Sequence, residues 1–369
     1  MKKLIVQGFL LMDIDVATLN NAGKKSGGSN DENGVAVKKI TKNGKTYPYV
    51  SGQAWRYWWR ETLQLNQGWI MSPLTKIAGK NQVISEANPI VYGDDDVFGY
   101  VAATKDIKLD EEGNAVLKNG KQVTENATVT RVSPLKNSAL VAVASTNTVE
   151  HFSVSARHEG NPVPYTKEEY SAVLKGMFSL DVSQIGTFSS YNKTGFLNLS
   201  QPHREEAIEA GATLLEDPSV RDAKSNAKTL VRLPQPVRLK RAKDTLLALK
   251  TLAGGAMQAS NMADVTPKFI VLAATTSGNH PFSQIAVEEK ANAYGYKASL
   301  SVDALREVLT DCQSQIVGTV YIGKRLGFMD EIQVELEKLA AEFANVELMP
   351  INKAIDSFCT QLETQIVNS

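Results

Sequence analysis

Tyr47-Pro-Tyr-Val-Ser-Gly-Gln-Ala-Trp-Arg-Tyr-Trp-Trp-Arg-Glu-Thr-Leu63 is the stretch that decides how this chain folds, and it holds three of the four tryptophans of the protein. Ser51 is a favourable N-cap, and no proline or glycine follows Gly52 within the stretch, so a helix is predicted to begin here. At about 100° per residue, the tryptophans, Ala54 and Leu63 take most of the helix circumference and predict a face packed in the core. The remaining strip carries Gln53, Arg56, Tyr57 and Arg60.

This polar strip allows two interpretations. Arginines on helices are usually solvated at the surface, which would leave the strip without a specific role. Two arginines one helical turn apart, beside an amide and a phenol, also suit contacts with a phosphate backbone. The helix by itself does not distinguish the two.

The composition is that of a globular protein without an excess of charge. The 369 residues are 43% hydrophobic and 22% charged, with a formal net charge of zero, which suits one elaborated domain or two smaller ones. Neutrality argues against binding nucleic acid by bulk charge, but it is compatible with a basic groove balanced by acidic surface. Two widely spaced cysteines, an interrupted apolar N-terminus and no apolar run of about 18 residues predict a cytoplasmic protein without a membrane partner.

The N-terminal segments indicate an α+β fold. Residues 4–12 read as a strand that is apolar on both faces, and a loop rich in glycine and asparagine follows at 20–34. Lys24 and Lys25 in that loop either grip phosphate or are simply solvated. Asn43-Gly44 predicts a hairpin before the tryptophan helix. A strand, an excursion and a helix in this order suit the first half of a ferredoxin-like or RNA-recognition βαββαβ unit.

The middle of the chain is expected to leave this unit and then return to it. Residues 66–130 look like an insertion that forms a protruding hairpin sub-domain. Within it, the acidic run Asp94–Asp96 is interpreted as a turn before a strand at 97–103. Further along, the predicted elements are a strand at 139–144, a short helix at 165–178 and another helix at 201–217.

The charge changes sign between residues 221 and 250, where nine basic residues stand against two acidic ones. In a neutral protein, this local excess suggests a polyanionic partner, and a solvated surface is an equally good interpretation. The small-residue loop Gly254–Asn261 follows, and its backbone could approach a ligand closely. An apolar strand at 268–274 and amphipathic helices at 302–309 and 329–343 complete the chain.

Residue types typical of catalysis are present but not arranged for it. The chain has no phosphate-binding glycine loop, dinucleotide fingerprint, zinc-protease motif or nucleophile elbow. Asp13, Asp15 and Asp31, near the first strand, could support RNA cleavage, but nothing in their spacing requires it. We therefore expect a protein that is not an enzyme and needs no metal or cofactor.

Four segments carry a family resemblance: the strand 4–12, Val50-Ser-Gly-Gln-Ala-Trp-Arg-Tyr-Trp-Trp-Arg60, Asp96-Val-Phe-Gly-Tyr100 and Arg131-Val-Ser-Pro-Leu-Lys136. In this order they resemble the DevR-type backbone subunit of CRISPR Cascade complexes, a RAMP-superfamily component of type I effectors, most like type I-B. The loop Gly254–Asn261 leading into the strand 268–274 fits the same family. The Ser-Gly-Gln-x-x-Arg motif of the helix is the most specific of these features.

The resemblance implies a modified ferredoxin-like or RNA-recognition (RRM) palm with large insertions. The palm would comprise residues 1–65, 128–200 and 266–369, the fingers 66–127 and the thumb 225–265. Several copies would polymerise along a guide CRISPR RNA, hold its backbone and present its spacer to target DNA in antiviral defence, while base pairing reads the sequence. The low aromatic content outside the tryptophan helix departs from RNA-recognition sheets that stack bases.

The residues expected to contact guide RNA are polar and basic positions in these motifs and in the basic stretch, with Met257 as a wedge between bases. They are Lys24, Lys25, Ser51, Gln53, Arg56, Tyr57, Arg60, Arg131, Ser133, Lys136, Arg232, Arg238, Lys240, Arg241, Met257, Gln258, Ser260 and Asn261.

Two rival functions remain open. An RNA-cleaving backbone subunit like those of type III complexes would use an aspartate after the first strand, and Asp31 is the candidate. A self-assembling structural protein without nucleic acid would leave Arg56 and Arg60 without a role. For a guide-RNA-binding backbone subunit, the expected partners also include other Cascade subunits. A nuclease-helicase or transposition proteins would act downstream of the complex.

Overall fold

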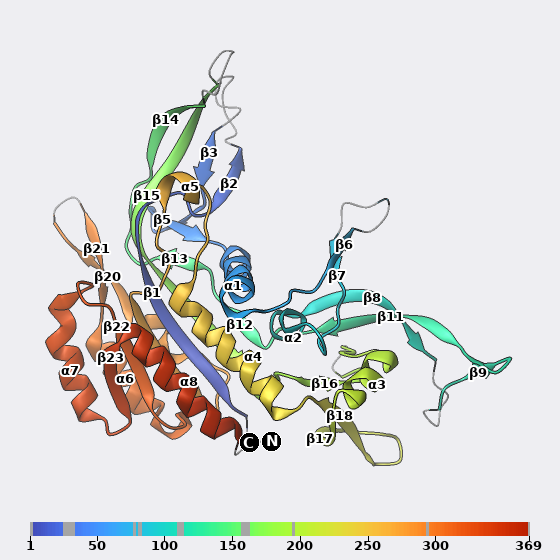
Figure 1. Cartoon of the computed structure of the whole chain (residues 1–369). Helices are drawn as coiled ribbons and strands as arrows, with labels where there is room; N and C mark the ends of the chain where they lie inside the picture. The colour runs from blue at the N-terminus through green and yellow to red at the C-terminus, as the bar shows by residue number, and fades with distance from the viewer. Residues whose placement is uncertain are drawn as a thin grey trace.

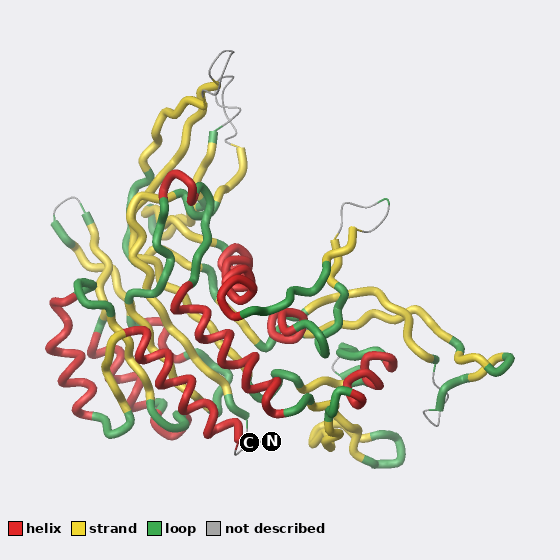
Figure 2. The backbone as a smooth tube through the Cα atoms, in the orientation of Figure 1, coloured by secondary structure: helices red, strands yellow, loops and turns green. Residues whose placement is uncertain are grey.

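One large, mostly antiparallel sheet organises the computed structural model, which describes residues 3–24, 34–76, 79, 83–108, 114–155, 163–193, 196–292 and 295–367 (Figures 1 and 2). The expected α+β class is confirmed. The main path of the sheet runs in the order β23 (Val346–Pro350), β22 (Val320–Lys324), β19 (Phe269–Thr275), β1 (Ile5–Ala17), β15 (Val163–Asp181), β13 (Leu140–Ala142), β5 (Lys45–Val50) and β4 (Lys39–Lys42).

The central strand is β1, which pairs antiparallel with β15 on one side and with β19 on the other. Successive side chains of a strand point to opposite faces. Leu10 accordingly belongs to one hydrophobic cluster, whereas Phe9 and Leu11 belong to a second cluster on the other face. The predicted strand with two apolar faces is confirmed, and its long pairings show why both faces had to be apolar.

Helices cover both faces of this sheet. The first cluster includes side chains from α1 (Gly52–Gln67), α4 (Gln235–Leu247) and α8 (Ile351–Val367). The second includes side chains from α6 (Val302–Asp311) and α7 (Gln333–Glu342). None of the helices within the described residues is both long and apolar enough to span a bilayer.

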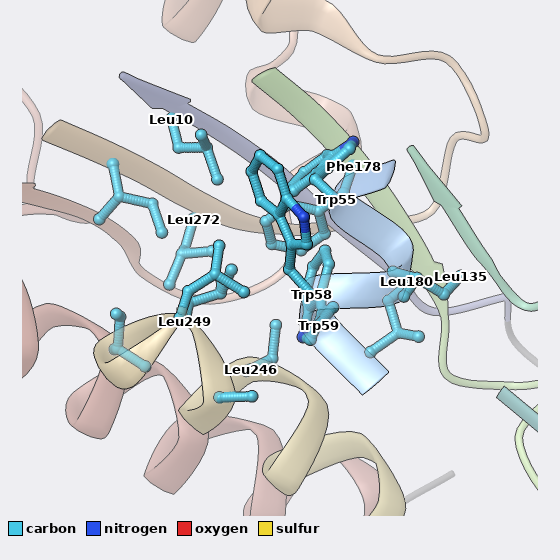
Figure 3. Close-up of a cluster of buried hydrophobic side chains, with 14 of the residues drawn as sticks. Leu10, Trp55, Trp58, Trp59, Leu135, Phe178, Leu180, Leu246, Leu249 and Leu272 are labelled. Carbon is cyan, nitrogen blue, oxygen red and sulfur yellow. The ribbon is translucent and has the colours of Figure 1, made fainter. Parts of the chain in front are cut away.

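The tryptophan face of α1 packs as predicted. Ser51 caps the helix by accepting a hydrogen bond from the Ala54 amide at 3.3 Å. Trp55 and Trp59 are fully buried, and the ring of Trp59 meets Phe178 of β15 edge-on, with the ring centroids 5.2 Å apart (Figure 3). Their indole N–H groups donate to main-chain carbonyls, so neither buried donor is left without an acceptor.

Trp58 belongs to the first cluster and also packs against the small-residue loop. Gly254 lies so close that a Cβ atom there would stand 2.2 Å from the Trp58 ring, and its φ of 154° is unfavourable for other residues. The glycine is therefore required by packing. The loop continues into the one-turn helix α5 (Gln258–Asn261).

Two arms leave the sheet (Figure 1). One is the hairpin of β8 (Tyr100–Ile107) and β11 (Thr124–Arg131), extended by β9 (Leu117–Lys118) and β10 (Lys121–Gln122). The other is formed by the outer part of β15 with β14 (Val149–Ser155), β2 (Asn21–Lys24) and β3 (Val35–Val37). Residues near the ends of both arms lie outside the described ranges.

Smaller elements surround these arms. A three-stranded sheet is formed by β16 (Thr187–Ser189), β18 (Ala227–Arg232) and β17 (Thr213–Arg221), next to α3 (Gln201–Glu209). The remaining short elements are β6 (Leu74–Lys76), β7 (Val83–Ser85), α2 (Gly93–Phe98), β12 (Leu135–Asn137), β20 (Ala286–Lys290) and β21 (Tyr296–Leu300).

Three local predictions differ from the structure. The predicted helix at 165–178 is wrong, because this segment is part of β15, where pairing with β1 and β14 outweighs its local helix signals. The run Asp94–Asp96 lies inside α2 rather than in a turn, with three carboxylates at the favourable N-terminal end of the helix. The helix predicted at 201–217 ends at Glu209. The hairpin at Asn43-Gly44 is confirmed by the pairing of β4 with β5.

Candidate nucleic-acid interface

A groove of about 610 Å³ lies at the N-terminal end of α1. Its walls come from the first turns of that helix and from residues 132–139, the segment that contains β12. The groove brings together five of the residues predicted to contact RNA, from two motifs that are far apart in the sequence: Ser51, Gln53, Arg56, Ser133 and Lys136. Gln53 and Lys136 are solvent-exposed and available to a ligand.

Arg56 forms the floor of the groove rather than its rim. Its Nη1 donates to the carbonyl of Leu135 at 2.7 Å and to Asn137 Oδ1 at 2.8 Å. Its Nη2 donates to the carbonyl of Phe98 at 3.0 Å and to Ser133 Oγ at 2.9 Å. One guanidinium thus fixes both walls of the groove relative to each other.

None of the four acceptors around Arg56 carries a charge. Burial, and then the nearby Arg60, lower the pKa of Arg56 to about 10, so the side chain remains protonated at neutral pH. Its positive charge therefore has no carboxylate partner within these hydrogen bonds. The positive end of the α1 dipole adds to it, and exposed Lys136 supplies another cation at the same groove. The arrangement favours an anion.

Sequence reasoning missed two asparagines that build this site. The side chain of Asn20 accepts a hydrogen bond from the Ser51 amide at 2.9 Å and so fixes the start of α1. Asn137 lines the groove, accepts from Arg56, and donates to the carbonyl of Gly52 at 3.0 Å. No local pattern distinguishes these asparagines from the others, because their role depends on segments that meet only in the fold.

The rest of the polar strip of α1 lies outside the groove lining. Tyr57 is 59% exposed, and its hydroxyl donates to Glu61 at 2.6 Å. Arg60 forms an ion pair with Asp94 at 3.2 Å, and the carboxylate of this pair is almost completely buried. These two side chains flank the site, with a carboxylate already beside each.

Arg131 and Arg241 are interior residues that share one carboxylate. Asp96 has no exposed surface, and its Oδ1 lies 2.7 Å from Arg131 Nη2. Its Oδ2 lies 2.9 Å from Arg241 Nη1 and accepts the Gly186 amide at 2.8 Å. We call Asp96, Arg131 and Arg241 the Asp96 cluster. It joins α2, β11 and α4, and both arginine side chains are almost completely buried.

Arg238 and Arg232 lie near this cluster. Arg238 is buried on α4 and donates from Nε to the carbonyl of Ile185 at 3.0 Å, and burial lowers its pKa to about 10. Arg232 is half-buried at the end of β18, and burial lowers its pKa as well. The structure does not place either side chain in the groove at α1.

Much of the positive excess at 221–250 is neutralised within the fold. Lys240 pairs with Asp244 one turn along α4 at 2.5 Å. Two further lysines reach across to α8, where Lys243 pairs with Glu363 and Lys250 pairs with Asp356 at 2.7 Å. A count of charges along the sequence could not foresee these partners, because α8 begins only at residue 351.

The most exposed methionine at the small-residue loop is not the predicted Met257 but Met262, which directly follows the loop. Met257 is half-buried, whereas Met262, which sequence reasoning missed, is 86% exposed. Both have positive φ values, 57° and 47°, and they bracket α5. Gln258 donates to the carbonyl of Gly254 and thereby braces the loop, and Ser260 and Asn261 lie on α5 beside it.

The remaining candidate residues lie at the end of a described range or outside the described ranges. Lys24 is the last residue of β2, and Lys25 and Asp31 lie outside the described residues. In the described ranges, no three His, Cys, Asp or Glu side chains are grouped as metal ligands would be.

Comparison with known proteins places these features in a family. Residues 13–294 match the family model described as CRISPR-associated negative auto-regulator DevR/Csa2. No curated protein matches the chain. A chain of a solved "CRISPR RNA-guided surveillance complex, pre-nicking" is 8% identical, with a TM-score of 0.50 and coverage of 97% of this chain and 99% of that one.

A second solved chain, from a "CRISPR RNA-guided surveillance complex", is 10% identical at the same coverage and has a TM-score of 0.49. At such low identity, the likeness at a TM-score of 0.50 concerns the fold alone. The family model, in contrast, matches more than half of the chain and includes α1 and both walls of the groove. The chain belongs to the DevR/Csa2 family of CRISPR-associated proteins.

Proposed function

We propose that this protein is a non-catalytic backbone subunit of a type I Cascade surveillance complex, in which several copies bind along one guide RNA and present its spacer to target DNA. The observation that carries the proposal is the groove at α1. There Gln53 and Lys136 are exposed above Arg56, whose charge meets only neutral acceptors. Such a site holds a phosphate backbone without reading bases.

The topology supports an RNA-recognition-like palm. The strands β19, β1, β15 and β13 are neighbours in this order, and all their pairings are antiparallel. One helix, α1, follows β1, and another, α4, lies between β15 and β19, so the chain order suits a βαββαβ unit with insertions. The sheet face that stacks bases in RNA-recognition domains is covered here, because Phe9 and Leu11 are buried. We therefore assign the backbone contacts to the end of α1.

One arm and the segment that follows α4 suit the proposed fingers and thumb. Residues 66–127 include most of the β8/β11 arm, which we assign as fingers, and the palm would take residues 1–65, 128–200 and 266–369. Within the proposed thumb, 225–265, α4 contributes Leu246 to the main core, so the segment after it is the part that can reach a neighbouring copy. Exposed Met262 in that segment is the better candidate for an apolar contact with bases.

The test is purification of the full chain, with its sibling subunits, from cells that carry the CRISPR array. The proposal predicts co-purified RNA of uniform length, protected from nuclease in regular steps, and an assembly that falls apart on RNase treatment. A monomer free of RNA would contradict it. Cleavage of a complementary RNA that depends on Asp31 would instead identify an RNA-cleaving backbone subunit.

A further inference from the structure

A cleft of about 940 Å³ lies beside β23, the strand that ends the main path of the large sheet. Among the described strands β23 pairs only with β22, so the main-chain N–H and C=O groups of its other edge meet no described strand. Leu348, Met349 and Pro350 of β23 line the cleft. We call it the β23 cleft, and it shares no lining residue with the groove at α1.

One wall of the β23 cleft is a single stripe of α7. Leu336 and Leu339 of this helix are buried in the second hydrophobic cluster, and Glu342 forms an ion pair with Arg306 of α6 at 2.7 Å. At about 100° per residue, the lining residues of α7 lie opposite Glu342, so they face away from α6. They border the open edge of β23 instead. These lining residues are Gln333, Glu337 and Ala340.

The remaining lining of the cleft is largely apolar and exposed. Leu326, in the loop after β22, is 92% exposed, the highest value among the exposed large hydrophobic residues of the described chain. Leu348 and Met349 are half-buried, and Ile351 begins α8 beside them. A free strand edge beside exposed apolar surface suits an extended chain, which pairs with the edge and buries every second side chain.

One charged side chain of the lining has no partner. Arg325 is exposed, and its guanidinium forms no hydrogen bond or ion pair with the described residues. In contrast, Lys324 is held by Asp330, and Glu337 accepts a hydrogen bond from Gln333 Nε2 at 2.8 Å. Arg325 follows the last residue of β22, at the end of the cleft where β22 and β23 both end. A carboxylate is therefore the complementary group at this end, and an extended chain carries one at its own C-terminus.

We propose that the β23 cleft binds the C-terminal tail of another protein as an added strand. The tail pairs with the edge of β23 up to Met349, because Pro350 has no N–H to donate. Its apolar side chains pack on Leu326 and Leu348, and its terminal carboxylate pairs with Arg325. The helix α8 of the same copy is not this tail, because it starts at the cleft and its 17 residues carry it roughly 25 Å away.

The probe is a set of heptapeptides selected on the full chain from a random library that presents free C-termini. Fluorescence polarisation then compares each selected peptide with its C-terminal amide. The free acid should bind about tenfold tighter, the typical effect of a hydrogen bond to a charged group. Arg325→Ala should reduce this ratio to about one. Leu326→Ser should weaken both forms together, and Val334→Ser, which alters an exposed apolar residue of α7 outside the cleft, should change neither.

Pairing with the strand edge has a readout of its own. N-methylation of the peptide amides that face β23 should abolish binding, whereas N-methylation of the alternate amides should not. Amide hydrogen exchange at residues 346–349 should slow when the peptide is bound.

Four results would overturn the inference: no enrichment of peptides, equal affinity of acid and amide, an acid-to-amide ratio that Arg325→Ala leaves unchanged, or full affinity in Leu326→Ser. Arg325 and Leu326 are both exposed, so the two variants should melt as the parent does.

The β23 cleft and the proposed function fail in different ways. Arg325→Ala should leave RNA binding unchanged, and Lys136→Ala should leave peptide binding unchanged. Peptide binding by a protein that binds no RNA retains the cleft and removes the proposed function. RNA binding by a protein that selects no peptide removes the cleft and retains the groove at α1.

Discussion

The groove at α1 and the Asp96 cluster are both built on arginines from the motifs that suggested nucleic-acid binding, yet they use them in opposite ways. In the groove, Arg56 meets only neutral acceptors beside exposed Gln53 and Lys136. In the cluster, Arg131 and Arg241 share a carboxylate that has no exposed surface. The position of the nearest carboxylate, rather than the density of basic residues, decides whether an arginine can serve a ligand.

The largest expected effect comes from breaking the Asp96 cluster. Asp96→Ala leaves two buried guanidinium groups without a counter-charge, so the free energy of unfolding should fall by about 3–5 kcal/mol. Denaturant titration of the full chain measures it. The surface substitution Glu216→Gln is the control and should change stability by less than about 0.5 kcal/mol. A midpoint for Asp96→Ala equal to that of the parent would mean that the cluster is not structural.

Arg56 lines the groove and is also held by internal hydrogen bonds, so its substitution tests whether binding and stability can be separated at one residue. Arg56→Lys keeps the charge but cannot reproduce the four hydrogen bonds, three to residues 133–137 and one to the carbonyl of Phe98, and it should lower the free energy of unfolding by about 1–3 kcal/mol. RNA affinity should fall for Arg56→Lys even at temperatures where the variant is fully folded, because the groove walls are no longer fixed. If RNA binding survives unchanged while stability drops, Arg56 acts only in folding.

Lys136→Ala should separate binding from stability. Because the lysine is exposed, the melting temperature should stay close to that of the parent. The slope of log affinity for single-stranded RNA against log salt should decrease by about 0.7, the value for one lost phosphate contact. Lys224→Ala, an exposed lysine outside the groove, is the matched control. Equal slopes for the two variants would place the RNA elsewhere.

The smallest expected effect comes from substituting Glu288, a carboxylate outside both the groove and the Asp96 cluster. Glu288 of β20 accepts from the Ser145 amide at 2.8 Å, from Lys45 at 2.9 Å and from Tyr47 at 3.2 Å. Despite its partial burial, these donors lower its pKa below the ordinary value. The native state thus favours the charged form, so this stabilisation is present near neutral pH and is lost as the pH falls through the acidic range. Glu288→Gln should flatten that part of the stability–pH curve in acid-titration melts, and an unchanged curve would show that the contacts are not maintained in solution.

Local patterns predicted the parts of the fold that local forces decide. The cap at Ser51, the tryptophan face of α1, the turn at Asn43-Gly44 and the doubly apolar β1 all follow from their own residues. The outer part of β15 does not, because its acidic start favours a helix until β1 and β14 are present as pairing partners. Long-range pairing overrides local preference in such segments.

The candidate site likewise combines residues that local motifs indicate with residues whose roles depend on long-range contacts. The sequence could indicate Gln53, Arg56 and Lys136, because each lies in a motif. It could not indicate that Arg131 would be buried beside Asp96, or that Asn137 would complete the groove, because these contacts join segments from different parts of the chain. Composition likewise assigned equal weight to lysines that the acidic residues of α8 later neutralise.

The place of β1 at the centre of the sheet has a consequence during synthesis. The strand is complete at Ala17, but β15 begins only at Val163 and β19 only at Phe269. At about 5–20 residues per second, a ribosome produces these partners roughly 7 to 50 seconds later. For that time the nascent chain carries an apolar strand with two open edges, which is prone to aggregate. We therefore expect the yield of folded protein to depend on chaperones that shield the first residues while the rest is being made.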